Sequence, residues 1–89
     1  MKEKFIFTDP GSCISECSDK LVTSIYGVRN VGDVKEGLRI SVIIRTNAPA
    51  SVVCRLYRNG ELRNVEYWTS TDTMELGERV RSYIGDLEE

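Results

Sequence analysis

Two strand-like runs joined by Asn59-Gly60 decide the fold: Ser51–Arg58 (SVVCRLYR) before the dipeptide and Glu61–Trp68 (ELRNVEYW) after it. Asn-Gly between alternating runs is the strongest short-range hairpin signal, because a type I′ turn needs positive φ at both central residues. A two-residue loop also sets which residues face each other. The sequence therefore predicts an antiparallel hairpin in which Arg58 lies opposite Glu61.

That register sorts the side chains of the hairpin onto two faces. On one face it pairs Leu56 with Arg63, Cys54 with Val65 and Val52 with Tyr67. On the other face it pairs Tyr57 with Leu62, Arg55 with Asn64, Val53 with Glu66 and Ser51 with Trp68. The first face is largely apolar, so we expect it to be the core face.

Upstream of the hairpin, residues 38–45 alternate with the period of a half-buried strand. Leu38, Ile40, Val42 and Ile44 fall on one side and are expected in the core. Residues 46–50 contain a proline and break this strand. Nearer the start, residues 4–8 predict a short strand with Phe5 and Phe7 on one face, and residues 9–12 predict a turn. For residues 12–20 we favour a short helix, and for residues 21–28 a strand.

The end of the chain predicts an amphipathic helix. Asp72 is placed to act as the N-cap, and Glu75 follows three residues later, as in a capping box. The apolar residues then recur on one stripe: Leu76, Val80, Tyr83, Ile84 and Leu87. Gly85 is expected at the C′ position that ends the helix.

These elements indicate an α+β fold in a single domain spanning residues 1–89. We expect an antiparallel sheet of four to five strands, a β-meander containing the Asn-Gly hairpin, packed with the C-terminal helix. The alternative is a small β-barrel or sandwich with a terminal helix, which applies if residues 12–20 are strand.

Composition excludes several kinds of chemistry. The chain has no histidine, which removes the commonest general base and zinc ligand. Its three cysteines, Cys13, Cys17 and Cys54, have neither the number nor the spacing of a structural zinc site. The seven glycines form no phosphate-binding loop. We expect no enzymatic activity, no metal and no cofactor. Without a signal peptide or an apolar membrane span, the sequence predicts a cytoplasmic protein that does not bind membranes.

The informative feature is the face of the predicted sheet opposite the core. It collects arginines, an amide and aromatic side chains, and we select six candidate binding residues there: Arg39, Arg45, Arg55, Tyr57, Asn64 and Trp68. Arginine, tyrosine and tryptophan are enriched at protein–protein hot spots, and the same residues stack bases and neutralise phosphates. A helix covering this face would instead make its apolar members a second small core.

We therefore expect a small non-catalytic protein-interaction module: an inhibitor, an adaptor or a complex subunit. An unidentified protein is the preferred partner, and a homodimer is one form of this hypothesis. The alternative is a single-stranded nucleic-acid-binding domain that uses the same face. A sequence pI of about 5.2 makes nucleic acid the less favoured partner.

Overall fold

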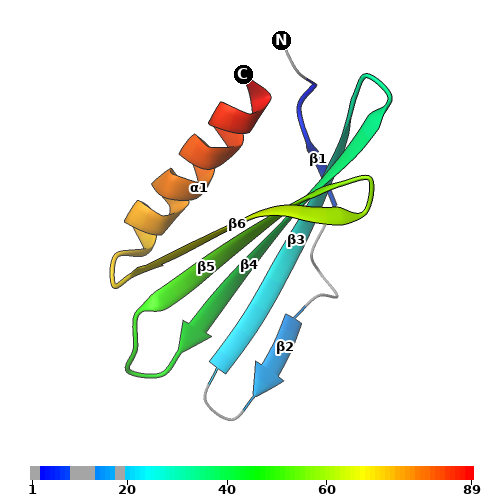
Figure 1. Cartoon of the computed structure of the whole chain (residues 1–89). Helices are drawn as coiled ribbons and strands as arrows, with labels where there is room; N and C mark the ends of the chain where they lie inside the picture. The colour runs from blue at the N-terminus through cyan, green and yellow to red at the C-terminus, as the bar shows by residue number, and fades with distance from the viewer. Residues whose placement is uncertain (1–2, 9–13, 18–19) are drawn as a thin grey trace.

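The computed structural model describes residues 3–8, 14–17 and 20–89, which form six strands and one helix (Figure 1). The elements are β1 (Ile6–Phe7), β2 (Ile14–Cys17), β3 (Lys20–Val31), β4 (Val34–Arg45), β5 (Ala50–Arg58), β6 (Glu61–Ser70) and α1 (Thr73–Glu88). All strand pairs are antiparallel, in the order β1-β3-β4-β5-β6. β2 pairs with β3 as well, so β1 and β2 share one edge position and the sheet is five strands across.

The predicted α+β fold, an antiparallel sheet with a C-terminal helix, is confirmed. The barrel or sandwich alternative is wrong: β6 and the β1/β2 pair are opposite edges of one open sheet. The helix predicted over residues 12–20 is also wrong where the structure describes it. Residues 14–17 form β2 and pair with residues 20–23 of β3, so their strand partner lies only a few residues further along the chain. The predicted turn at 9–12 and the rest of that helix lie outside the described residues.

Two tight hairpins set the register of the central strands. β3 and β4 are joined by Gly32-Asp33, and Gly32 has a φ of 62°, as the first loop residue of a type II′ turn requires. This ladder runs from Val31 opposite Val34 to Lys20 opposite Arg45. In the β5–β6 hairpin, Asn59 and Gly60 have φ values of 51° and 84°. The predicted Asn-Gly hairpin is therefore confirmed.

A β-bulge corrects the predicted register of that hairpin. Arg58 faces Glu61 and Tyr57 faces Leu62 as expected, but Leu56 faces Asn64 because Arg63 is an extra residue in β6. From that point every pair is shifted by one residue, and a one-residue shift moves each β6 side chain to the opposite face. The pairs are Arg55 with Val65, Cys54 with Glu66, Val53 with Tyr67, Val52 with Trp68 and Ser51 with Thr69.

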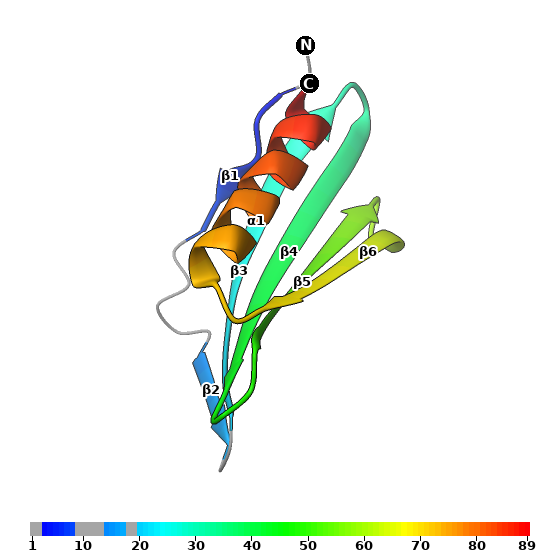
Figure 2. The ribbon, with the colours of Figure 1, turned by 90° about the vertical axis from the view of Figure 1, so that its left-hand side faces the viewer.

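The helix packs against one face of the sheet, as Figure 2 shows. Asp72 is its N-cap, and the side chain accepts a hydrogen bond of 3.0 Å from the Met74 amide. The capping box is replaced by a relay: the Asp72 amide donates to Ser70 Oγ, and Ser70 Oγ donates to Glu75 Oε2. The helix continues through Gly85 to Glu88, so the expected end at Gly85 is wrong. All five residues of the predicted apolar stripe pack in the core.

The core lies between α1 and the sheet. Its fully or almost fully buried side chains are Phe5, Leu38, Ile40, Val52, Cys54 and Leu76. Three residues expected there are not in the core. Ile44, with 49% exposure, lies near the end of β4 that extends beyond the helix (Figure 1). Val65 and Tyr67, with 47% and 58% exposure, are on the opposite face of the sheet because of the bulge. Within the described residues, no helix is both long and apolar enough to span a bilayer.

A buried ion cluster joins the ends of the described chain to the sheet. Glu36 Oε1 accepts from Arg29 Nε at 2.8 Å, and Glu36 Oε2 accepts from Arg58 at 3.0 Å. Arg29 Nη1 also donates to the backbone oxygens of Glu3 and Leu87. One guanidinium therefore ties the N-terminal segment, β4 and the last turn of α1 together.

Candidate functional site

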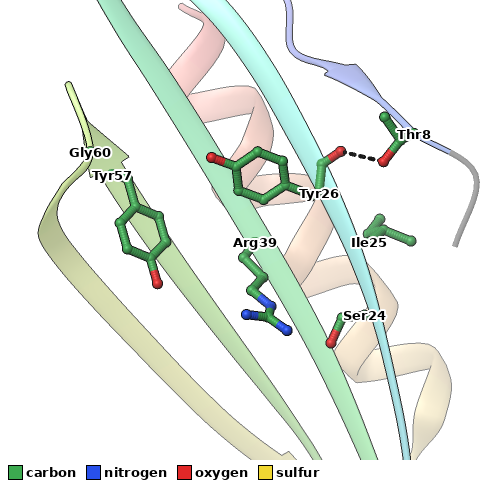
Figure 3. Close-up of a pocket in the computed structure, with 7 residues that line it drawn as sticks. All are labelled: Thr8, Ser24, Ile25, Tyr26, Arg39, Tyr57 and Gly60. Atoms are coloured by element: carbon green, nitrogen blue, oxygen red, sulfur yellow. Dashed lines mark hydrogen bonds between the residues drawn. The ribbon is translucent and has the colours of Figure 1, made fainter. Parts of the chain in front are cut away.

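The face of the sheet opposite α1, called here the open face, is the candidate binding surface (Figure 3). Ladder register fixes its members, because directly opposed residues share a face. Hydrogen bonds of 3.0 Å between Ser24 Oγ and Ser41 Oγ, and of 3.2 Å between Ser51 Oγ and Tyr67 Oη, agree with this assignment. The described members of the open face are Val22, Ser24, Tyr26, Val28, Asn30, Lys35, Arg39, Ser41, Ile43, Arg45, Ser51, Val53, Arg55, Tyr57, Leu62, Val65, Tyr67 and Thr69, with Ile6 of β1 at its edge.

Large apolar side chains are unusually exposed on this face. Of the seven large apolar residues that are exposed in the described chain, five lie here: Ile6 (72%), Tyr67 (58%), Leu62 (51%), Val65 (47%) and Tyr26 (41%). By register, Ile6 and Tyr26 lie on β1 and β3, Leu62, Val65 and Tyr67 lie on β6, and Arg39 and Arg55 lie between the two groups. The open face therefore combines exposed apolar side chains on both sides with a central pair of arginines.

The charges of the open face all have one sign. Arg39 lies directly opposite Arg55, and neither guanidinium has a carboxylate within 4 Å among the described residues. The carboxylates carried by β4 and β6 are Glu36, Glu61 and Glu66, and their register places all three on the helix side. The strands thus separate basic groups from acidic ones across the sheet.

Two tyrosines and Arg39 frame a shallow hollow of about 420 Å³ on the open face. In Figure 3, Tyr26 extends across β4 towards Tyr57, and the Arg39 side chain lies beside both rings. Tyr26 lies over Gly37, where a Cβ atom would overlap the tyrosine hydroxyl. Glycine at position 37 therefore allows the Tyr26 ring to lie against the sheet and form one wall of the hollow.

Comparisons of the chain with protein-family models, curated proteins and solved structures find no match. The function is therefore argued from the open face alone.

The structure brings together three of the six candidate residues: Arg39, Arg55 and Tyr57. Arg45 is on the same side of the sheet but lies six residues further along β4, roughly 20 Å from Arg39 at the rise of a strand. Asn64 and Trp68 are on the helix face, so their expected place on the open face is wrong. Asn64 Nδ2 donates to the Tyr83 hydroxyl at 3.2 Å, and Trp68 packs edge-on against the Tyr83 ring at 5.8 Å.

Tyr26 and Tyr67 are members of the site that the sequence reasoning missed. A signal for Tyr26 was present: Gly-Asp between two strand-like runs is a two-residue hairpin loop, and pairing outward from it places Tyr26 opposite Arg39. Tyr67 was assigned to the core because the bulge at Arg63 was not recognised. The residues around Arg63 include no glycine that would mark a bulge.

The thiol of Cys54, in the core, is unsuited to act as a nucleophile. Cys54 is buried, and burial, together with the nearby charge of Glu66, raises the pKa of its thiol to about 11. The thiolate is the reactive form, so this cysteine is a core residue. Across the described ranges, no cluster of three or more cysteine and acidic side chains is placed to hold a metal ion.

Proposed function

We propose that this chain is a small non-catalytic protein-interaction module that binds its partner through the open face. The observation that carries the proposal is the row Tyr26, Arg39, Arg55 and Val65, which crosses β3 to β6 in direct register and is not covered by α1. Tyrosine and arginine are the residues that most often dominate binding energy at protein interfaces.

The division of the molecule into two faces supports this assignment. The helix face buries most of the core, and among the described residues of the open face only Val53 is a buried apolar residue, whereas Tyr26, Leu62, Val65 and Tyr67 are exposed and bury little area within the chain. A sheet is also a rigid support, so its backbone loses little additional freedom when a partner binds. Inhibitors, adaptors and complex subunits all use such a surface.

Photo-crosslinking in extracts of the cells that produce the protein tests this proposal. Benzoylphenylalanine at position 67 of the open face is expected to give a discrete crosslinked product. The same group at Glu78, exposed on α1, is the matched control and is expected to give none. A product twice the mass of the chain would identify the homodimer. Crosslinks only from position 78, or from neither position, would contradict the proposal.

Single-stranded nucleic acid is the second candidate partner, and a specific observation favours it. The hollow places Arg39 beside two tyrosine rings, and aromatic rings beside a cation suit a base next to a phosphate. This hypothesis predicts that a fluorescent oligothymidylate binds at low salt and weakens as salt rises. Arg55→Ala and Tyr57→Ala should each reduce its affinity. No change of fluorescence polarisation at low salt would eliminate it.

A further inference from the structure

We propose that the partner of the open face is an acidic protein segment whose carboxylates bridge Arg39 and Arg55. This inference rests on the proposed function and adds the chemistry of the partner. It is argued from the pairing of the two arginines, from the separation of charge across the sheet and from the aliphatic side chains that surround the pair.

The pairing of Arg39 with Arg55 has no structural benefit within the chain. Side chains directly opposite each other on neighbouring strands have Cβ atoms about 5 Å apart, and like charges in that arrangement destabilise a sheet. The other arginines of β3, β5 and β6 contrast with them: Arg29 and Arg58 bind Glu36, and Arg63 binds Glu61. A carboxylate placed between the two guanidinium groups would remove their repulsion and form charge-assisted hydrogen bonds with both.

The separation of charge makes the face selective for the sign of its partner. Lys35, Arg39, Arg45 and Arg55 occupy the open side of β4 and β5, and no described side chain of β3 to β6 on that side is acidic. Because the described residues of the face include no carboxylate, the charges of a basic segment would be repelled there. Complementary charge fixes specificity and register at interfaces more than it adds affinity.

The surroundings of the pair favour a protein over a nucleic acid. Val65 lies directly opposite Arg55 and is 47% exposed, Leu62 lies opposite Tyr57 and is 51% exposed, and Ile6 at the edge of the face is 72% exposed. Removing aliphatic groups from water is favourable in free energy when they pack against apolar side chains, and contributes little when they meet phosphates or sugars. A segment in which aspartate or glutamate alternates with apolar residues matches both features, since carboxylates meet Arg39 and Arg55 while apolar side chains cover the aliphatic residues.

Selection from a random peptide display library tests the inference without knowledge of the natural partner. Three proteins serve as bait: the wild type, the double variant Arg39→Glu/Arg55→Glu, and the control Arg79→Glu/Arg81→Glu. The control changes the net charge of the chain by the same amount but alters exposed positions of α1. Circular dichroism and thermal unfolding establish that all three baits are folded before selection.

The wild type and the control are expected to enrich peptides rich in aspartate and glutamate. The open-face variant should lose these peptides, with affinities at least about tenfold weaker, because two charge-assisted contacts are replaced by repulsion. It should instead enrich basic peptides. Enrichment by the wild type of peptides without acidic character, bound at the open face, would overturn this inference and leave the proposed function standing. Recovery of no peptide by the wild type would overturn both, as would tighter binding of an oligothymidylate than of any recovered peptide.

Discussion

At the scale of single residues, Gly37 and Gly27 look equivalent but differ in what lies over them. Both are interior strand positions, and each has an aromatic ring where a Cβ would be. A Cβ atom at position 37 would meet the hydroxyl end of the exposed Tyr26. A Cβ atom at position 27 would meet the ring of Phe7, which packs against the core. The free end of an exposed side chain can move at little cost, whereas a packed ring cannot.

Gly37→Ala should therefore separate stability from the proposed binding. We expect its free energy of unfolding to be unchanged or up to about 1 kcal/mol higher, because glycine in a strand interior is unfavourable relative to alanine. The Tyr26 ring, however, must leave the wall of the hollow, so binding by the open face should weaken. Gly27→Ala is the matched control, and displacement of Phe7 should cost it roughly 1–3 kcal/mol. Denaturant unfolding measures both variants. A loss of stability in Gly37→Ala as large as in Gly27→Ala would contradict this account.

Cys54 gives a second test at the residue scale. It has no exposed surface, and its thiol pKa is raised to about 11, first by burial and then by the charge of Glu66. In a Cys13→Ser/Cys17→Ser background, Cys54 should not react with a thiol reagent at pH 8 until denaturant is added, because little thiolate forms and the reagent has no access. Rapid labelling of the folded protein at pH 8 would show that the core opens around β5.

At the scale of elements, the β-bulge in β6 decides which side chains meet the helix. Because Arg63 is the extra residue, it has no partner in the β5–β6 ladder, and that ladder places Trp68 opposite Val52. Removing it would leave Leu62 opposite Tyr57 and Asn64 opposite Leu56, as they are now. Removing a residue from the regular part of β6, such as Glu66, would instead force the residues after it onto the wrong face.

Deletion of Arg63 should consequently be tolerated, and deletion of Glu66 should not. Trp68, the one tryptophan of the chain, reports on this directly. We expect its fluorescence emission and its protection from acrylamide to be unchanged without Arg63, since the contact with Tyr83 persists. Without Glu66, the emission should shift to longer wavelength and the midpoint of unfolding should fall. A red shift on deletion of Arg63 would mean that the ladder is paired differently.

The same element shows how far sequence can predict this fold and its site. The Asn-Gly turn, the N-cap Asp72 and the apolar stripe of α1 follow from local rules, and the structure has them. The bulge does not follow, because no glycine or proline in residues 61–65 marks it and its benefit is tertiary: it brings Trp68 against Tyr83. Three of the six candidate residues come together because β4 and β5 are paired as their alternation implies, whereas the residues from β6 were displaced by a single insertion.

At the scale of the whole molecule, the cluster of Arg29, Glu36 and Arg58 connects segments that are distant in sequence. The side chains of Arg29 and Glu36 are only 1% and 3% exposed. Arg29 also lies over the Phe5 ring at 4.3 Å, and the Phe5 amide donates to Glu88 at 2.8 Å. The N-terminal segment and the last turn of α1 are therefore fastened to β4 through charged groups as well as apolar contacts. Breaking a buried pair by removing one partner typically costs about 3–5 kcal/mol.

This cluster makes the stability of the whole chain sensitive to acid. Burial raises the pKa of Glu36, but hydrogen bonds from Arg58 and Arg29 outweigh that effect and hold its pKa below the ordinary value of 4.5. A carboxyl group with a lowered pKa in the folded state stabilises the fold above its unfolded pKa, and that contribution is lost as pH falls through the folded pKa. The free energy of unfolding should thus decline below about pH 4.5. Denaturant unfolding followed by Trp68 fluorescence, at a series of pH values, measures how steeply the free energy of unfolding falls with pH.

Glu36→Gln should be less stable at pH 7 and show a shallower decline, because the group that takes up the proton is gone. Glu61→Gln, which removes an exposed carboxylate paired with Arg63, should retain the wild-type slope. If the free energy of unfolding fell with pH equally steeply in wild type and Glu36→Gln, another group would cause the acid sensitivity. That result would contradict the proposed stabilising role of the buried cluster.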